Sequence, residues 1–270
     1  RPPKEIISEV NKLRKFAYNN PTEMHVRFPK EFYQSHLSFA GFLNCHPNDL
    51  FFSHNVTESL NHFILNSKLS ENGEIFIFDM EYGAMLNICK HRAEKEKKKL
   101  NIINISKFFN DDLMTEEILN EKILSELKNY KFPSGSLLIM SHVLTSNGFI
   151  LPILKIAEYL KNKDVINVVD GAHAIGAFSI DFSTFRNIHF YGGNLHKWMM
   201  GLAGIGFGWI NPNQDLKIDS LMIGWPNYDN AAHLDDFNLQ GTARKFYLKG
   251  TIDFSSFMTI STLVKWWKEQ

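Results

Sequence analysis

The sequence of 270 residues predicts an α/β fold in which a mostly parallel central sheet carries helices on both faces. Short apolar runs of strand length alternate with longer segments in which apolar residues recur at helical spacing. Polar side chains follow several of the strand-like runs, where open α/β sheets place the residues that bind ligands. The content of 44% hydrophobic and 13% aromatic residues is enough to bury a sizeable core. We therefore expect one large domain over residues 1–270.

The charge and the cysteine content exclude several classes of protein. Lys plus Arg and Asp plus Glu both number 29, so no net field favours nucleic acid or a membrane surface. The two cysteines, Cys45 and Cys89, are too few for a disulfide framework, and the sequence contains neither a secretory signal nor a long apolar segment. We expect a cytoplasmic protein whose partner is a small molecule, not nucleic acid or a membrane.

The first 45 residues are predicted to form a helical segment that packs on the remainder of the domain. Apolar residues recur at helical spacing within residues 4–18, after a Pro-Pro start that suits a first helical turn. The same pattern repeats within residues 29–43. Both helices are expected to supply packing and no chemistry.

A short strand-like run, residues 51–53, precedes a helix predicted over residues 56–69. Asn55 followed by Glu58 three residues later is a capping-box arrangement, which places the start of the helix. The first amides of such a helix point outward at the positive end of its dipole, which suits a phosphate, and the Thr57 hydroxyl is a further donor. The segment taken alone is more typical of an ordinary capped helix than of a phosphate site.

The middle of the chain alternates between strands and helices, as expected for βα units. Two candidate ligand-binding residues follow strands in this region. Tyr82 lies just beyond the first of them, and Thr145 lies in the polar run after the third. The predicted strands are residues 74–79, 101–106 and 136–140, and the predicted helices are residues 84–100, 115–130 and 152–161.

Two stretches in the second half of the chain carry unusual polar residues. An apolar strand, residues 165–169, ends on Asp170, and His173 follows three residues later. Taken alone, this Asp-x-x-His pattern is also compatible with a metal pair or a helix cap.

Lys197 lies between two strand-like runs, residues 188–191 and 204–210, where a simple hairpin would need only turn residues. A lysine that forms a Schiff base and a carboxylate that pairs with a pyridine nitrogen are the parts of a pyridoxal phosphate site. Lys197 and Asp170 provide these parts. Beyond them, residues 219–233 are loop-like and residues 255–267 predict an amphipathic helix.

Four motifs occur in the order in which they occur in the class V aminotransferases, and the sequence resembles that family. These fold-type-I pyridoxal phosphate enzymes include cysteine desulfurases and isopenicillin N epimerase-like proteins. Each motif alone is weak, whereas the ordered set is specific and spans most of the chain. The motifs are residues 55–61 (Asn-Val-Thr-Glu-Ser-Leu-Asn), 81–82 (Glu-Tyr), 169–173 (Val-Asp-Gly-Ala-His) and 194–198 (Asn-Leu-His-Lys-Trp).

The resemblance implies a catalytic role for each of four residues. Lys197 would hold pyridoxal 5′-phosphate as an internal aldimine and then move the α-proton of an amino-acid substrate. Asp170 would pair with the pyridine nitrogen, and His173 would reach the phenolic oxygen of the cofactor. Tyr82 would stack on the ring, and Thr145 occupies the position where many relatives place an asparagine near the same oxygen.

The resemblance also implies how the phosphate is held. The amides of Val56 and Thr57, the Thr57 hydroxyl and the side chains of Asn194 and His196 would bind it. A fifth match, residues 249–257, contains Thr251.

In this family the corresponding threonine reaches the phosphate of the neighbouring subunit, so the resemblance implies a homodimer. Thr242, in a second Gly-Thr pair, is the competing candidate for that role.

The sequence departs from the family pattern in three places. Gly201-Leu202 stands where the family often has a Gly-Pro step, and the first active-site loop near the amino terminus is not evident. The small C-terminal domain of the family would lie beyond Gln270, so we expect the chain to be a fragment.

The motifs leave the reaction outcome open. They favour the epimerase and carbon–sulfur lyase or desulfurase branch, because the segments around Lys197 and Asp170 are most similar to it. An aminotransferase proper is the alternative within the family.

Two rival classes are a non-catalytic protein that keeps the fold for binding and a metal-dependent hydrolase. No metal is expected under the favoured interpretation. The hydrolase would use Asp79, His142, Asp170, His173 and His196.

Overall fold

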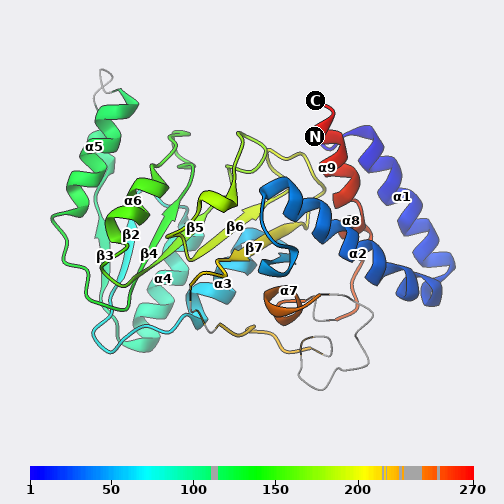
Figure 1. Cartoon of the computed structure of the whole chain (residues 1–270), viewed down its shortest axis with the longest axis horizontal. Helices are drawn as coiled ribbons and strands as arrows, with labels where there is room; N and C mark the ends of the chain where they lie inside the picture. Colours follow the sequence, from blue (N-terminus) through cyan, green and yellow to red (C-terminus); the bar gives the residue numbers. More distant parts are fainter. Residues whose placement is uncertain (111–114, 215, 217, 225–226, 228–238, 248–249) are drawn as a thin grey trace.

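The computed structural model describes residues 1–110, 115–214, 216, 218–224, 227, 239–247 and 250–270 (Figure 1). Lys249, which opens the fifth predicted motif, lies outside the described residues, as do residues 225–226 and 228–233 of the predicted loop.

A seven-stranded sheet runs through the centre of the described structure, in the order β1-β7-β6-β5-β4-β2-β3. The strands from β2 to β6 are parallel to their neighbours, whereas β7 pairs antiparallel with both β6 and β1. The predicted mostly parallel sheet is therefore confirmed. The strands are β1 (Leu50–Ser53), β2 (Ile75–Phe78), β3 (Leu100–Ile103), β4 (Ser136–Ser141), β5 (Val165–Asp170), β6 (Phe190–Asn194) and β7 (Gly206–Ile210).

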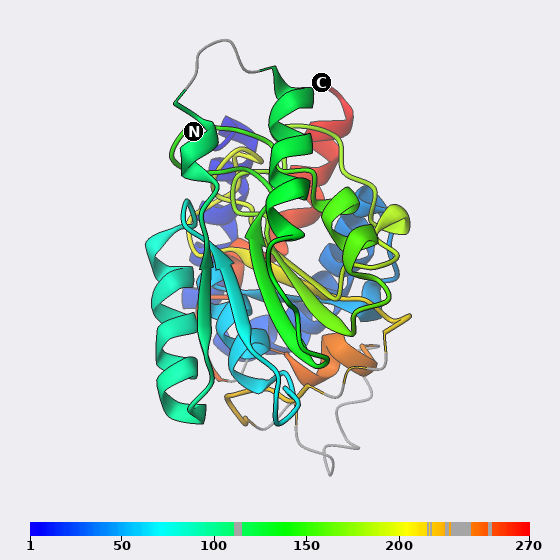
Figure 2. The same ribbon diagram turned by 90° about the vertical axis from the view of Figure 1, so that its left-hand side faces the viewer.

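Helices cover both faces of the sheet, as predicted (Figure 2). Side chains alternate between the two faces along each buried strand: in β2, Ile75 and Ile77 face one core, and Phe76 and Phe78 face the other. The first core is formed with α3 and α4, and the second with α2, α5, α6 and the last two helices. The α-helices are α1 (Lys4–Asn19), α2 (Pro21–Leu43), α3 (Val56–Asn66), α4 (Gly83–Glu96), α5 (Glu116–Leu127), α6 (Ile153–Leu160), α7 (Gly241–Lys245), α8 (Ser255–Met258) and α9 (Ile260–Lys268).

The amino-terminal helices pack against the carboxyl-terminal ones. The helix α2 contacts α8 and α9, and the buried Ser35 hydroxyl donates a hydrogen bond to the Phe257 carbonyl at 2.8 Å. Both chain ends therefore lie at the same side of the molecule (Figure 1). Among the described helices, none combines the length and the apolar character needed to span a bilayer.

Several predicted helix boundaries were wrong. The helix α2 begins at Pro21 and contains Pro29, which was expected to lie at its start. The helix α3 ends at Asn66 instead of residue 69, because Ser67 is extended. The helix α4 ends at Glu96, where Lys97 takes a left-handed conformation with φ of 52°, and Leu100 then belongs to β3.

The single carboxyl-terminal helix expected over residues 255–267 is divided into α8 and α9. The division is at Thr259, whose hydroxyl donates to the Ser256 carbonyl at 2.7 Å. A threonine that bonds back to the preceding turn competes with the regular helical ladder.

Candidate active site

A cavity of about 190 Å³ lies where the carboxyl ends of the central strands meet the starts of α3 and α4. Nine of the ten residues expected to form the site line it, and Thr251 does not. The structure thus brings together four motifs that are far apart in the sequence. The lining residues are Asn55, Val56, Thr57, Tyr82, Ser141, Val143, Thr145, Asp170, Ala172, His173, Asn194, His196 and Lys197.

Lys197 lies in the connection between the antiparallel strands β6 and β7, so this region is a hairpin with a wide, structured loop. The loop closes through the Gly201 amide, which donates to the Leu195 carbonyl at 2.7 Å, and the Met200 amide, which donates to the Lys197 carbonyl at 3.0 Å. A Cβ atom at position 201 would lie 2.9 Å from the Leu195 carbonyl oxygen. Close backbone packing therefore requires glycine there, even though the following residue is Leu202 and not proline.

The amine of Lys197 faces His173. Its Nζ lies 2.9 Å from His173 Nε2, and the pKa of the lysine is lowered by burial, against an opposing attraction from Asp170. The pKa of His173 is also lowered, first by burial and then by Lys197. Both shifts favour the neutral forms of the two side chains.

Asp170 ends β5 and is 4% exposed. Its Oδ1 accepts a hydrogen bond from the Ala172 amide at 2.9 Å, and Oδ2 has no hydrogen-bond partner among the described residues. Burial raises the pKa of this carboxyl to about 6, while the Ala172 amide and Lys197 act in the opposite direction. A buried carboxylate with one unpaired oxygen in a cavity is a site for a cationic or N–H donor ligand.

The chain next to Asp170 is shaped by the Tyr191 ring. A Cβ atom at Gly171 would lie 2.1 Å from that ring, so only glycine lets the strand end pass it. The Tyr191 hydroxyl lies 2.8 Å from His142 Nδ1. His142 is thus a buried neighbour of the site and does not line the cavity.

The start of α3 has the predicted cap, since the Asn55 side chain accepts from the Glu58 amide at 2.9 Å. The Val56 amide, expected to hold a phosphate, instead donates to Asn194 Oδ1 at 2.8 Å. The bond therefore engages both the Val56 amide and the side-chain oxygen of Asn194, two residues that were predicted to bind the phosphate. The Thr57 amide and hydroxyl have no partner among the described residues and line the cavity.

His196 is held by its Nδ1, which lies 3.3 Å from the Ile205 carbonyl oxygen. Because a carbonyl only accepts, Nδ1 carries the proton, and a neutral ring then offers only an acceptor at Nε2. The pKa of His196 is lowered by burial and by Lys197, while the Ile205 carbonyl raises it. A phosphate dianion nearby would favour the doubly protonated ring.

Tyr82 and Thr145 form the open side of the cavity. Tyr82 precedes α4 directly and is 53% exposed, so its ring is accessible to a planar ligand. Thr145 is also exposed.

Glu81 is a further residue of this region to which the sequence assigns no role. Its carboxyl accepts from the Ser141 amide at 2.7 Å and bonds the Ser141 hydroxyl as well. Burial raises its pKa to about 8, and the nearby charge of Asp170 adds to this effect. The signal in the sequence was its position at the end of a buried strand, next to Tyr82.

Thr251 and Thr242 do not line the cavity around Lys197. Thr251 lies in a separate groove of about 280 Å³ together with Arg14, His25 and Asp253, and Thr242 lies in α7. A contribution of Thr251 to a neighbouring subunit stays a prediction.

Of the five residues of the rival metal site, Asp170, His173 and His196 line the cavity, but Asp79 and His142 do not. Asp79 accepts hydrogen bonds from the amides of Ile105 and Ser106, and His142 is paired with Tyr191. Within the described residues, no three His, Cys, Asp or Glu side chains are grouped as metal ligands.

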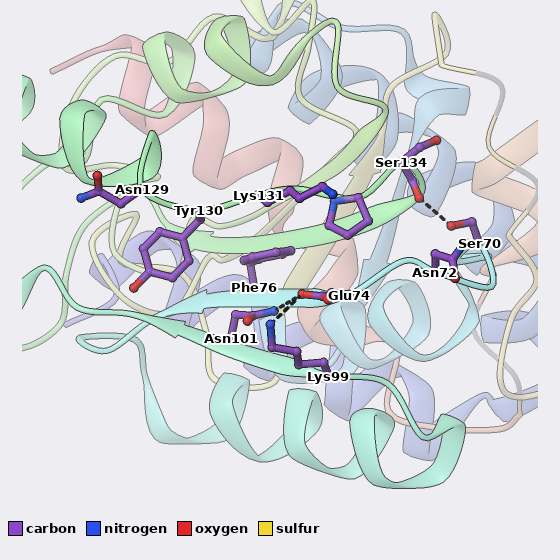
Figure 3. Close-up of a pocket in the computed structure, with 11 residues that line it drawn as sticks. Ser70, Asn72, Glu74, Phe76, Lys99, Asn101, Asn129, Tyr130, Lys131 and Ser134 are labelled. Carbon is purple, nitrogen blue, oxygen red and sulfur yellow. Dashed lines mark hydrogen bonds and ion pairs between the residues drawn. The ribbon is translucent and has the colours of Figure 1, made fainter.

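A larger hollow of about 940 Å³ lies at the opposite end of the sheet (Figure 3). Its polar groups bond one another: Glu74 accepts from Asn101 at 2.7 Å and is paired with Lys99 at 3.4 Å. It is an open groove at the amino ends of β2 to β4, whereas open α/β sheets bind ligands at the carboxyl ends. We therefore place the candidate active site at Lys197 despite the smaller volume.

Comparison with known proteins agrees with this assignment. The family model described as aminotransferase class-V matches residues 2–270. The chain is 26% identical over 224 residues to isopenicillin N epimerase of Streptomyces clavuligerus, covering 83% of this chain and 54% of that protein. It is 27% identical over 189 residues to a probable cysteine desulfurase of Mycoplasma genitalium, covering 68% of this chain and 43% of that protein.

Among solved structures, the cystine C–S lyase C-DES in complex with its reaction product cysteine persulfide has a TM-score of 0.81. The two chains are 19% identical, and the match covers 99% of this chain and 69% of that one. This likeness shows a shared fold. The chain spans about half the length of the curated relatives described above.

Proposed function

The chain belongs to the class V aminotransferase family, and from this premise we propose that it works as a pyridoxal 5′-phosphate-dependent enzyme that removes the α-proton of an amino acid. The observation that carries the proposal is one cavity in which the Lys197 amine, the His173 ring and the unpaired oxygen of Asp170 face the same space.

The residues of the cavity fit this cofactor. A protonated pyridine nitrogen supplies the donor that Asp170 Oδ2 lacks, and a charge-assisted bond of this kind stabilises by about 1.5 to 3 kcal/mol. The Thr57 amide and hydroxyl at the start of α3 supply donors for a phosphate, as does His196 once it is doubly protonated. The exposed Tyr82 ring is available to cover a planar group.

When bound, pyridoxal phosphate supplies a ring that withdraws the electrons left behind when an amino acid loses its α-proton. The protein's part is to bind, to orient and to move that proton. Asp170 would keep the ring nitrogen protonated, and His173 and Thr145 would bond the phenolic oxygen. The Lys197 amine would attach the cofactor and then serve as the base, because its lowered pKa leaves more of it neutral.

The epimerase and the carbon–sulfur lyase or desulfurase are the favoured reactions, in agreement with the names of the relatives. An aminotransferase proper is the second possibility within the family. We also propose a homodimer in the cytoplasm whose small-molecule substrate is an amino acid. A non-catalytic binding protein is disfavoured because Lys197 and Asp170 are both present and face one cavity.

The test is an absorbance spectrum of the purified chain with added pyridoxal phosphate, before and after borohydride, followed by mass mapping of the reduced peptide. We expect the adduct on the peptide that contains Lys197, and its loss in Lys197→Ala but not in Lys155→Ala, which removes an exposed lysine of α6. An equal adduct in Lys197→Ala would refute the assignment. Exchange of the α-proton of amino acids in D₂O then separates a catalyst from a protein that only binds.

A further inference from the structure

The His173 ring is held from two sides by consecutive residues of the lysine loop. Its Nε2 lies 2.9 Å from Lys197 Nζ, and its Nδ1 accepts a hydrogen bond from Trp198 Nε1 at 3.2 Å. Trp198 is 54% exposed, so burial of the indole in the core does not explain its position. The described residues offer its N–H no other hydrogen-bond partner.

The two contacts together determine where the protons are. An indole N–H only donates, so the Nδ1 that accepts it carries no proton, and the proton of a neutral imidazole is then on Nε2. Nε2–H in turn needs an acceptor at 2.9 Å, and the only lone pair there is that of an uncharged Lys197 amine. A lysine ammonium has three donors and no acceptor, so it would oppose Nε2–H.

From this geometry we propose that Trp198 is a positioning residue: its N–H fixes His173 as the Nε2–H tautomer and so holds Lys197 as the neutral, nucleophilic amine. The inference rests on the proposed function only in taking Lys197 as the group that attaches the cofactor. Loss of the indole N–H frees His173 to adopt the other tautomer, which accepts from a charged Lys197.

Backbone packing holds the Trp198 indole in position for this contact. The turn that carries His173 reaches Gly176, where φ is 84° and a Cβ atom would lie 2.5 Å from the Met199 amide nitrogen. The loop after Asp170 and the lysine loop are thus packed main chain to main chain beside the His173–Trp198 bond.

The other titratable groups around Lys197 are Asp170 at the end of β5 and His196 in the same loop. Asp170 favours the ammonium, whereas burial of the amine opposes it, and so does the Nε2–H tautomer of His173, which offers Lys197 no acceptor. The balance depends on the tautomer of His173, which Trp198 sets. The same tautomer presents an N–H donor to the phenolic oxygen of a bound cofactor.

The experiment compares wild type with Trp198→Phe, which keeps an aromatic ring and removes the N–H. Trp266→Phe is the matched control, because the Trp266 N–H has no hydrogen-bond partner among the described residues. The chain is labelled with ¹⁵N-histidine and freed of cofactor, and long-range ¹H–¹⁵N spectra report each tautomer, with His173→Gln identifying the signal. We expect Nε2–H in wild type and in the control, and a population of Nδ1–H in Trp198→Phe.

The second readout is the titration of Lys197, measured by trace acetylation with acetic anhydride over a pH series and mass mapping of the peptide. Loss of one hydrogen bond is expected to raise the pKa of Lys197 by about half to one unit in Trp198→Phe and to leave the control unchanged. Neither readout needs pyridoxal phosphate, so the inference holds or fails separately from the proposed function. An Nδ1–H tautomer in wild type, or unchanged tautomer and titration in Trp198→Phe, would overturn it.

Discussion

Asp170 is the residue whose burial and hydrogen bonding indicate most clearly which kind of ligand the cavity binds. It is almost fully buried, bonds one amide and leaves its other oxygen unpaired in the cavity. Burial raises its pKa to about 6, which means that the folded protein holds this carboxylate at a cost until a donor arrives. The expected donor is the ring nitrogen of the cofactor.

We predict that Asp170→Asn slows α-proton exchange by about 10- to 100-fold, because it removes a charge-assisted bond of about 1.5 to 3 kcal/mol. Exchange of an amino-acid α-proton in D₂O, followed by NMR, measures the effect. Glu94→Gln, which removes an exposed acid of α4, is the control and should leave the rate unchanged. A wild-type rate in Asp170→Asn would mean that the carboxylate does not face the ring nitrogen.

Thr57 is predicted to bind the phosphate through an amide and a hydroxyl that are free of other described partners. Thr57→Ala removes the hydroxyl and should weaken pyridoxal phosphate binding by about 10-fold, the equivalent of one bond to a charged group. Fluorescence or absorbance titration gives the Kd, and circular dichroism checks that the fold is kept. Unchanged affinity would place the phosphate elsewhere.

Glu81 makes the free energy of unfolding depend on pH, and the direction of its pKa shift gives the sign. Its pKa is raised from 4.5 to about 8 in the folded state, so the folded protein binds a proton that the unfolded chain has lost in that range. This contribution to stability is complete below pH 4.5 and is lost as the pH rises through about 8.

We therefore expect thermal unfolding of wild type to show this loss, and Glu81→Gln, which stays neutral, to lack it. A slope that is identical in both proteins would show that Glu81 titrates normally.

The helix α2 contains a buried titratable residue whose effect on the pH dependence of stability is opposite in sign to that of Glu81. His36 is 1% exposed, packs against the rings of Phe32 and Phe52, and neither of its nitrogens has a hydrogen-bond partner in the described structure. Burial lowers its pKa from 6.5 to about 3, so its contribution to stability is present above pH 6.5 and is lost as the pH falls toward 3.

We predict that His36→Leu reduces the loss of stability at acid pH. At neutral pH the free energy of unfolding should be equal or higher, because no unsatisfied nitrogen remains in the core. Denaturant unfolding at a series of pH values measures it. His91→Leu, which replaces an exposed histidine of α4, is the comparison and should keep the wild-type profile.

The elements of the fold were largely predictable, because their signals are local. The apolar run and the final acid of β5 lie within a few residues of each other, and so do Asn55 and Glu58 at the start of α3. The boundaries that were wrong depend on less local features, such as Pro29 inside α2, where packing on the carboxyl-terminal helices outweighs the cost of a proline.

The contacts of the site were less predictable than its members. The bond from the Val56 amide to Asn194 joins residues 138 positions apart, and no spacing pattern encodes it. Glu81 was missed because a buried acid at a strand end has the same local sequence as an exposed one. The partner of the Trp198 N–H is likewise set by how two loops meet in space.

At the scale of the whole molecule, residues of this one chain form the side of the cavity next to the sheet, and the cavity is open at Tyr82 and Thr145. The chain spans about half the length of the curated relatives. The groove that contains Thr251 is separate from the cavity, so within one chain this threonine does not line the candidate site.

If a second copy supplies Thr251, cofactor affinity should rise with protein concentration as the dimer forms. We expect Thr251→Ala to weaken binding by several-fold at high concentration only, and Thr242→Ala to have no effect. Cofactor titrations at several protein concentrations, with sedimentation to follow the dimer, test this. Equal losses in both variants, or none, would argue against a contribution from Thr251.

The close approach of β7 to the start of α3 has one further consequence. A Cβ atom at Gly206 would lie 2.5 Å from the Asn55 backbone, so the hairpin that carries Lys197 touches the helix end proposed to bind the phosphate without a side chain between them. Main-chain packing therefore sets the distance from that helix end to the Lys197 amine. We therefore expect the site to prefer phosphorylated aldehydes whose phosphate and carbonyl are separated by that distance over longer or shorter ones.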